Sequence, residues 1–242
     1  RDAEAAIQKK DPSFSIRKLD YDDAATYKML GQGETEGVFQ LESSGMKQVL
    51  VGLQPQNLED VIALISLYRP GPMDSIPTYL RNRHEPDKIS YKTPQLAHIL
   101  DVTNGCIVYQ EQVMQIFREL AGFSFGQADN VRRAMSKKKH AVMEAEREHF
   151  VHGCTEPGHE CPGCVANGIS EKVANEIYDE MSSFASYAFN KSHAACYAYV
   201  AFQTAYLKCH YPSEFMAALL TSVLDNTDKV IEYSGECARL GI

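Results

Sequence analysis

The sequence contains no run of about 20 apolar residues, the length that a membrane-spanning helix needs. It opens at Arg1 without a basic-then-apolar leader, so we expect neither a membrane protein nor a secreted one. An excess of positive charge is also missing, because 24 lysines and arginines stand against 32 aspartates and glutamates, for a net charge of -8. This balance disfavours a protein that coats nucleic acid non-specifically, although it permits a local basic site.

Several motifs that mark common catalytic sites are absent as well. The sequence has no G-x4-G-K-[ST] phosphate loop, no G-x-G-x-x-G and no acylating-serine turn of the form G-x-S-x-G. No pair of aspartates is flanked by strand residues in a way that would hold two Mg²⁺ ions. Asp22 and Asp23 stand at an expected helix start, where acidic groups favour the helix dipole. We therefore expect no complete catalytic centre within this chain.

What is present is the composition of an ordinary globular protein, with 242 residues, 44% hydrophobic and 23% charged. This length allows one large domain or two small ones. The seven cysteines are an odd number, and several stand singly in apolar helical patterns, as Cys196 and Cys209 do. We therefore expect a reduced, cytoplasmic protein rather than a disulfide framework.

Helix start and stop signals run through the whole chain. Asp20 is expected to cap a helix that ends just before Gly31, and Asn57 to cap one that continues to Tyr68. Ser124-x-x-Gln127 has the form of a capping box. In the helix expected at 111–120, Val113, Ile116, Phe117 and Leu120 fall on one face, and Gly122 closes it. Further helices are expected at residues 43–53, 75–83, 94–101, 140–152, 170–181, 193–210 and 213–224.

Strand-like segments are few. Residues 105–109 are apolar and extended in pattern, and residues 37–41 are similar but could equally form a turn. The sequence therefore predicts a mostly α protein, one continuous helical domain with a few short strands and a Cys-rich loop at 153–168.

The first candidate site is a basic cluster on one short helix and its exit. Its members are Arg132, Arg133, Lys137, Lys138 and Lys139. Arg133 and Lys137 are four residues apart and so point the same way. Arginine forks suit phosphate oxygens, and several such charges on one face suit a polyphosphate. The alternative is a solvated charged face on which Asp129 pairs with Arg133.

The second candidate is the segment 187–193, whose sequence is YAFNKSH. It places Lys191, Ser192 and His193 at an expected helix start, where backbone N–H groups and the lysine would form an anion site. The aromatic residues just before could stack on a base. The alternative is an ordinary helix start with Ser192 as its N-cap. Ser192 and His193 are adjacent, so their side chains do not face each other and do not imply a nucleophile.

The third candidate is a cysteine-rich stretch between residues 152 and 164. Cys161-Pro-Gly-Cys164 is a C-x2-C knuckle, and Cys154 and His159 could complete a tetrahedral zinc site. Such a zinc would be structural, because four protein ligands leave no open position for a reacting water. The alternative is a flexible hairpin with free thiols.

Taken together, four long blocks closely resemble the C-family of replicative DNA polymerases, the bacterial DNA polymerase III alpha subunits. The blocks include ETEGVFQLESSG, LISLYRPGPM, YQEQVMQIFREL and FNKSHAACYAY, within residues 34–55, 59–73, 109–139 and 189–222. The resemblance covers nearly the whole chain, in order. It implies a helical fingers domain over residues 19–242, preceded by the tail of a palm region at residues 1–18.

The resemblance also implies roles for individual residues. In this family an arginine pair, the basic motif that follows it, the FNKSH motif and the RPGP element face the incoming triphosphate. The matching positions here are Arg132, Arg133, Lys137, Lys138, Lys191, Ser192, His193 and Arg69. Ser136 replaces the more usual glycine, which changes the backbone freedom at the exit of the basic helix. The cysteine loop lies outside the common pattern and resembles an insertion in some Gram-positive-type members.

By the same resemblance, the catalytic aspartates and two Mg²⁺ ions belong to the palm, which would lie before Arg1. The fingers would supply positive charge to the β and γ phosphates. We therefore expect this chain to act within a DNA-directed DNA polymerase and to be inactive alone. The expected partners are primer-template DNA, the incoming deoxynucleoside triphosphate, the rest of the polymerase chain and the replisome, with the sliding clamp bound through other regions.

Two competing hypotheses belong to other functional classes. One is a non-catalytic helical module whose basic helix docks an acidic protein partner. The other is a small structural module stabilised by zinc. A fingers domain should bind triphosphate or primer-template weakly and with strong salt dependence, whereas a protein-docking module should not.

Overall fold

The computed structural model describes residues 1–137, 140–185 and 187–242. Within these residues the chain forms fourteen α-helices, and its β pairing is limited to two isolated bridges. The prediction of a mostly α protein is therefore confirmed. None of the helices in this described part of the chain is both long and apolar enough to span a membrane.

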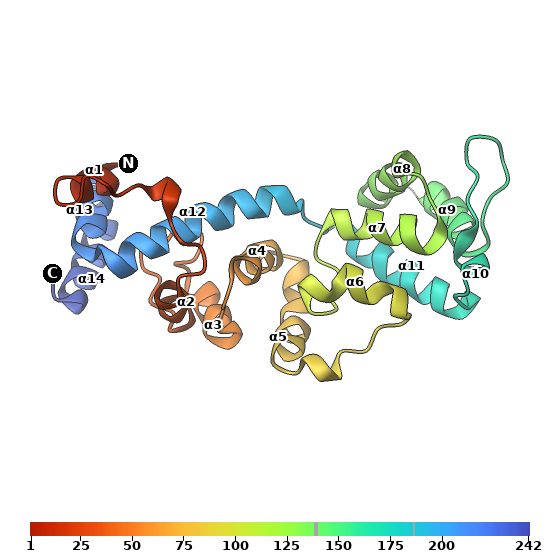
Figure 1. The fold of residues 1–242 in the computed structure, drawn as a ribbon, viewed down its shortest axis with the longest axis horizontal. Coiled ribbons are helices and arrows are strands. Elements are labelled where there is room, and N and C mark those ends of the chain that lie inside the picture. The colour runs from red at the N-terminus through yellow and green to blue at the C-terminus, as the bar shows by residue number, and fades with distance from the viewer. Residues whose placement is uncertain (138–139, 186) are drawn as a thin grey trace. The chain divides into compact units, whose positions relative to one another are not determined.

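The helices gather into two compact units, which are described separately here (Figure 1). Unit 1 contains residues Arg1–Ile65 and Ala195–Ile242, and unit 2 contains Ser66–Ala194. The chain thus passes from one unit to the other twice.

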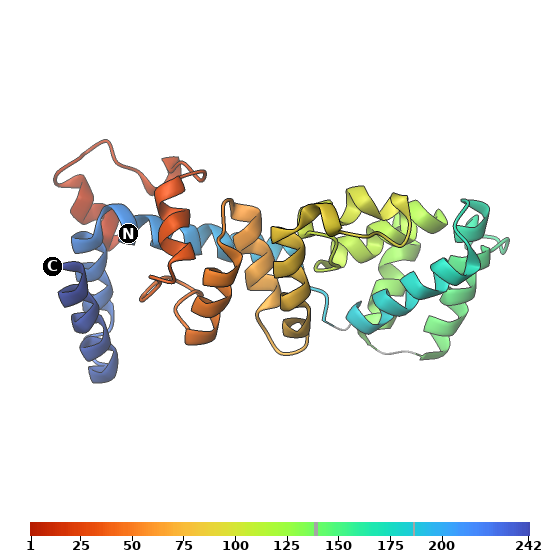
Figure 2. The same cartoon turned by 90° about the horizontal axis from the view of Figure 1, so that it is seen from below.

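Unit 1 is built from the two ends of the chain. Its core contains Ile7, Phe14, Phe215, Met216 and Tyr233. Figure 2 shows α13 and α14 side by side, and both belong to this core. Its helices are α1 (Asp2–Gln8), α2 (Ala24–Gly31), α3 (Ser44–Leu53), most of α4 (Leu58–Leu67), α12 (Lys191–His210) from Ala195 onward, α13 (Pro212–Ser222) and α14 (Thr227–Leu240).

In unit 1 the cap of α4 agrees with the sequence prediction and the cap of α2 differs from it. Ser43 caps α3, and Asn57 accepts a hydrogen bond from the backbone N–H of Asp60 at 3.0 Å. Helix α2 is capped by Asp23 instead of Asp20, because Asp23 receives the N–H of Thr26 at 2.8 Å. Residues 37–41 form turns, which was the alternative to a strand.

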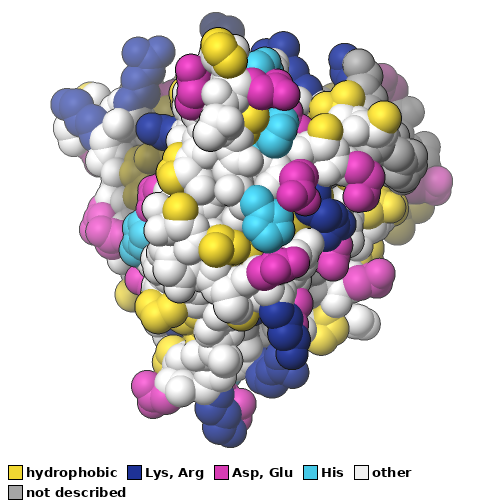
Figure 3. All heavy atoms as spheres, turned by 90° about the vertical axis from the view of Figure 1, so that its right-hand side faces the viewer, with side chains coloured by type: hydrophobic (Ala, Val, Ile, Leu, Met, Phe, Trp, Pro, Cys, Tyr) yellow, Lys and Arg dark blue, Asp and Glu magenta, His cyan; other side chains and the backbone are white. Residues whose placement is uncertain are grey.

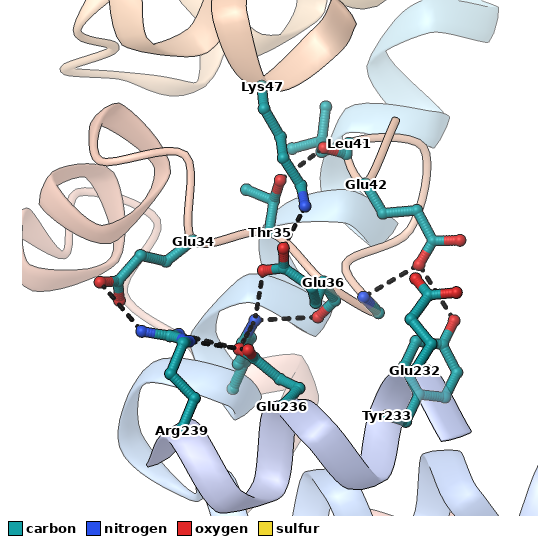
Figure 4. Close-up of polar contacts among 12 residues, drawn as sticks. Glu34, Thr35, Glu36, Leu41, Glu42, Lys47, Glu232, Tyr233, Glu236 and Arg239 are labelled. Carbon is teal, nitrogen blue, oxygen red and sulfur yellow. Dashed lines mark hydrogen bonds and ion pairs between the residues drawn. The ribbon is translucent and has the colours of Figure 1, made fainter. Parts of the chain in front are cut away.

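Unit 1 also contains a network of ion pairs that joins the loop at 34–42 to α12 and α14 (Figure 4). Nζ of Lys208 lies 2.7 Å from Oε1 of Glu236, and these side chains are only 1% and 4% exposed. Lys208 also donates to the carbonyl of Glu36 at 2.9 Å. Arg239 holds both oxygens of Glu236 at 2.7 and 2.8 Å.

The electrostatics of Glu236 follow from these contacts. Burial alone would raise the pKa of Glu236, but hydrogen bonds from Arg239 and Lys208 outweigh it and lower the pKa to about 2. Glu236 is therefore ionised at neutral pH and links α14 to α12 through its ion pair with Lys208.

Unit 2 packs around α7, whose apolar face the sequence predicts correctly. Val113, Ile116, Phe117 and Leu120 are all fully buried. They contact a core that includes Phe150 of the neighbouring α9. The helices of unit 2 are α5 (Ile76–His84), α6 (Ala97–Leu100), α7 (Gln110–Ala121), α8 (Phe125–Ser136), α9 (His140–His152), α10 (Gly163–Ala166) and α11 (Glu171–Ala185).

The ends of α7 and α8 are fixed by local signals that the sequence analysis identifies. Gly122 adopts the left-handed conformation that ends α7, with φ 74. Ser124 and Gln127 form the expected capping box, with bonds of 2.8 and 3.3 Å. These caps set the turn that places α8 against α7.

The segment 105–109 forms no strand and makes a single parallel bridge, between Tyr109 and Phe189. This bridge lies immediately before α7 on one side and before α12 on the other. It therefore brings the start of α7 beside the segment that precedes α12.

Candidate functional site

The candidate site begins at this bridge, where three backbone-directed hydrogen bonds hold two segments together. The N–H of Phe189 donates to the carbonyl of Val108 at 3.2 Å, and the N–H of Gln110 donates to Phe189 at 2.9 Å. The side-chain amide of Gln110 adds a bond to the carbonyl of Ala188 at 3.0 Å. The segment before α12 is thus fixed along the first turn of α7.

Arg132 is tied to the same place from α8. Its guanidinium donates to Oε1 of Gln110 at 2.9 Å and to Oδ1 of Asp129 at 2.7 and 3.0 Å. The side chain is 18% exposed, so these bonds are partly shielded from water. Gln110 therefore links the basic helix to the segment before α12, using its amide as both donor and acceptor.

Arg133 points to a more open position than Arg132. Its side chain is 63% exposed, and Nη2 lies 2.7 Å from Oδ2 of Asp129. The pairing of Asp129 with Arg133 that the sequence analysis raises as an alternative is therefore present, but Asp129 binds Arg132 as well. Hydrogen bonding from Arg132, with the charges of both arginines, lowers the pKa of Asp129 below its usual value.

Of the three remaining basic residues of this cluster, the structure describes one. Lys137 is exposed and follows α8 as its C-cap residue. Lys138 lies outside the described residues, as does Lys139.

The start of α12 binds an anion, and that anion is a side chain of the protein. The N–H of Lys191 donates to both carboxylate oxygens of Glu111, each at 3.1 Å. Asn190 donates to Glu111 at 3.1 Å and accepts the N–H of His193 at 2.9 Å, so Asn190 caps this helix and Ser192 does not. The positive end of α12 therefore faces the first turn of α7.

Two side chains of the FNKSH motif, Lys191 and His193, contact aromatic rings. Nζ of Lys191 stands 5.3 Å from the centre of the Tyr109 ring, a cation–π distance. The rings of Phe189 and His193 meet edge to face at 5.4 Å. Ser192 is exposed in the first turn of α12.

Arg69 holds the same segment from the RPGP element. Its Nε donates to the carbonyl of Ser66 at 2.8 Å, and Nη2 donates to the carbonyl of Tyr187. Its guanidinium lies 4.3 Å above the Phe189 ring, and burial lowers the pKa of Arg69. The structure therefore places Arg69 where it fixes the backbone at 187–189.

Gly71 allows this close approach. It adopts φ 102, and an added Cβ would lie 2.4 Å from the ring of Tyr187. A side chain at this position would displace Tyr187, so glycine is required both by the backbone and by the space.

A pocket of about 500 Å³ opens between α7 and α8 beside these contacts. Among the predicted site residues in the described part of the chain, Arg132 lines it. The other lining residues relevant to the site are Gln110, Glu111, Met114, Phe125 and Asn190. Arg118, Glu119 and Asp129 also line it, so the pocket combines guanidinium, carboxylate, amide and apolar groups.

Three of the residues that organise the site are not among those predicted from sequence. Gln110 and Glu111 read as the polar first turn of an amphipathic helix, and Asn190 reads as a loop residue. The signal that identifies Gln110 and Glu111 is spatial, because their partners lie about 80 residues away in the chain. Asn at a helix start was the available local signal for Asn190.

The cysteine-rich loop does not bring its four predicted ligands together. Cys154 and Cys161 face each other across an antiparallel backbone bridge, with bonds of 2.9 Å in both directions. Cys164 is fully buried, whereas His159 is exposed. No group of three or more His, Cys, Asp or Glu side chains among the described residues is placed to hold a metal ion. The zinc hypothesis has no support from this arrangement.

The surface around this loop is mixed in charge. Figure 3 looks onto the end of unit 2 that carries α9, α10 and α11, where acidic, basic and histidine side chains are interspersed with apolar ones. His152 lies 3.8 Å from Glu171, and Arg147 lies 2.6 Å from Asp179. Basic and acidic side chains are therefore paired on this face.

Comparison with known proteins gives the family of the chain. The family model described as bacterial DNA polymerase III alpha subunit finger domain matches residues 1–158. The chain is 48% identical over 240 residues to the DNA polymerase III subunit alpha of Thermus aquaticus, and 44% identical over 230 residues to that of Staphylococcus aureus. These matches cover 97% and 95% of the chain but 19% and 21% of the relatives, so the chain spans about a fifth of their length. The chain belongs to the bacterial DNA polymerase III alpha subunit finger domain family.

Proposed function

We propose that this chain is the fingers part of a bacterial replicative DNA polymerase and that it binds the incoming deoxynucleoside triphosphate and the primer-template. The observation that carries the proposal is the convergence of Arg132 and Lys191 on the first turn of α7, through Gln110 and Glu111. Arg133 follows Arg132 on α8, and its side chain projects into solvent. Cationic groups from two distant segments are thus available to one anionic ligand.

The chemistry of this group is electrostatic. In template-directed synthesis negative charge develops on the leaving pyrophosphate, and fixed guanidinium and ammonium groups stabilise that charge. Arg133 is exposed enough to reach a β or γ phosphate, while Arg132 is anchored at the pocket between α7 and α8. Lys137, Lys138, Ser192 and His193 are proposed as further contacts on the same ligand.

Asp129 is the counter-ion that a triphosphate would replace on Arg133. The pair is solvent-exposed on the arginine side, so its net contribution is small, about 0–1 kcal/mol. A triphosphate carries more negative charge than one carboxylate, and its oxygens accept from an arginine fork in the same geometry. The exchange is therefore favourable once the nucleotide is present.

Activation of the primer 3′-hydroxyl by Mg²⁺ is assigned to parts of the polymerase outside this chain. The isolated chain is accordingly proposed to be inactive in nucleotide incorporation. Its partners would be the rest of the polymerase chain, DNA and the replisome, with the sliding clamp bound elsewhere. All seven cysteines are free, which suits the proposed cytoplasmic location.

The test is an arginine substitution in the full-length polymerase. Arg133→Ala should raise the KM for incoming nucleotide or lower kcat, together by about ten- to a hundredfold in kcat/KM, because a charge-assisted bond to phosphate is lost. The Kd for primer-template, measured by fluorescence anisotropy, should change little. Lys172→Ala, an exposed cation on α11, is the matched control. Unchanged nucleotide kinetics in Arg133→Ala would contradict the proposed function.

A further inference from the structure

We propose that Gln110 and Glu111 are positioning residues of the nucleotide site, which hold Arg132 and the segment 188–191 in one arrangement. This inference rests on the proposed function, and it concerns residues outside the arginine pair and the FNKSH motif. It is carried by the hydrogen bonds of two consecutive side chains in the first turn of α7.

Gln110 uses both ends of its side-chain amide. The carbonyl oxygen accepts from Nη1 of Arg132 at 2.9 Å, and the NH₂ group donates to the carbonyl of Ala188 at 3.0 Å. A rigid group that donates and accepts at once is found only in Asn and Gln side chains, apart from hydroxyls and imidazole. Gln110 therefore fixes the distance between the guanidinium on α8 and the backbone that leads into the FNKSH motif.

Glu111 completes this arrangement on the side of α12. Both carboxylate oxygens accept the N–H of Lys191 at 3.1 Å, and one also accepts from Asn190 at 3.1 Å. A carboxylate at a helix start satisfies an unpaired N–H and interacts well with the dipole. Glu111 thus sets the backbone position of Lys191, and with it the origin of the Lys191 side chain.

Gln110 and Asp129 together set the orientation of the Arg132 guanidinium. Asp129 binds the guanidinium on the Nε and Nη2 side, and Gln110 binds it at Nη1. With Gln110 removed, one restraint is lost and the guanidinium can rotate about its own side chain. Nucleotide binding would then include the entropic cost of ordering the Arg132 guanidinium, and the nucleotide would bind more weakly.

The first experiment uses Gln110→Ala in the full-length polymerase. We expect the nucleotide KM to rise about three- to tenfold, the range of one ordinary hydrogen bond, because Gln110 acts on the ligand only through Arg132, with an unchanged Kd for primer-template. Gln127→Ala is the matched control, because it removes a capping-box bond of α8 without contacting Gln110. This control should lower the unfolding temperature while leaving the nucleotide KM unchanged.

A double-mutant cycle separates positioning from a merely structural role. If Gln110 acts through Arg132, then Gln110→Ala should have little further effect on the nucleotide KM when Arg132→Ala is already present. Additive effects of the two substitutions would overturn the assignment. Gln110→Met, which keeps the length of the side chain and makes neither hydrogen bond, should raise the nucleotide KM to the same extent and serves if the alanine variant folds poorly.

Glu111 is tested in the same way against Lys191. Glu111→Gln keeps one acceptor oxygen and should lie between wild type and Glu111→Ala in nucleotide KM, and Glu111→Ala should be non-additive with Lys191→Ala. Glu148→Gln, an exposed carboxylate on α9, is the control. If Arg133→Ala impairs nucleotide use while Gln110→Ala and Glu111→Ala stay within about twofold of wild type, the positioning role is wrong and the proposed function stands. If none of these variants affects nucleotide use, the proposed function itself fails.

Discussion

Oδ2 of Asp129 lies 2.7 Å from Nη2 of Arg133, one helical turn further along α8. Its other oxygen lies 2.7 Å from Nη2 of Arg132, so a single carboxylate pairs with both arginines of the basic helix and offsets only one of their two charges. A phosphate ligand must compete with Asp129 for these donors. The affinity of the site therefore depends on an internal anion as well as on the two cations.

Asp129→Asn should strengthen nucleotide binding, because it removes the competing charge and keeps the shape of the side chain. We expect the nucleotide KM of the full-length polymerase to fall about two- to fivefold at low salt, the range of an exposed ion pair, and by less at high salt. Asp179→Asn, which breaks the pair with Arg147 on another helix, is the control. A KM that stays constant or rises would show that Asp129 organises the arginines instead of competing for them.

Glu236→Gln should destabilise unit 1 at neutral pH, because it leaves the buried Lys208 with the more distant carboxylate of Glu36, at 3.7 Å, as its charged partner. Loss of one partner of a buried pair costs about 3–5 kcal/mol in free energy of unfolding, and the pair with Glu36 places the expected loss below that range. Glu232→Gln is the control, since Glu232 lies on the same helix and pairs with Lys229 at a more exposed position. Urea unfolding followed by circular dichroism measures the free energy of unfolding of both variants.

The same ion pair predicts a dependence of stability on pH. The pKa of Glu236 is lowered to about 2 in the folded chain, from an ordinary value of 4.5. Its contribution is therefore complete above about pH 4.5 and is lost as the pH falls toward about 2. The stability difference between wild type and Glu236→Gln should narrow between pH 5 and pH 3. A difference that is constant over this range would contradict the ion-pair account.

Gly71→Ala should disturb the segment that Arg69 holds. An added Cβ would lie 2.4 Å from the Tyr187 ring, and φ 102 is unfavourable for alanine. We expect a loss of more than about 1 kcal/mol in stability and a higher nucleotide KM in the full-length polymerase. Gly126→Ala, in α8 with open space around it, should instead stabilise the chain by about 0.5–1 kcal/mol. Equal effects of the two substitutions would argue against the contact with Tyr187.

The thiols should differ widely in reactivity. Burial raises the pKa of Cys164 to about 12 and that of Cys106 to about 11, whereas Cys196 is exposed on α12. Because the thiolate is the reactive form, alkylation of the folded chain at pH 8 should label Cys196 first and leave Cys164 and Cys106 unmodified until unfolding. Mass spectrometry after timed alkylation gives the order. Zinc near one equivalent per chain, with metal-dependent protection of Cys154, would support the zinc hypothesis instead.

Local signals predicted much of the helical structure. Asn57, Gly122 and the Ser124 capping box all act within a few residues of their own position, so the sequence pattern contains the whole interaction. Asp20 was the wrong choice for α2, because the cap requires a carboxylate three residues before the N–H it receives, and Asp23 meets that condition with Thr26.

The candidate site was predictable only in part for the opposite reason. The arginine pair and the FNKSH motif are visible as local concentrations of charge. Gln110 and Glu111 gain their importance from partners far along the chain, and nothing in their own helical turn distinguishes them from ordinary surface residues. Because Glu111 and Lys191 are 80 residues apart in the chain, the sequence gives no indication that the Glu111 carboxylate binds at the start of α12.

The bond between Glu111 and Lys191 also has a consequence for how the chain is made. The two residues are 80 positions apart, so the first turn of α12 closes on a helix synthesised much earlier. At about 5–20 residues per second, Lys191 leaves the ribosome about 4–16 s after Glu111. During that interval α7 can pack its apolar face, but its first turn has no partner from the later segment. The geometry that holds Lys191 is therefore completed late in synthesis, and a truncated chain that ends before this residue cannot assemble it.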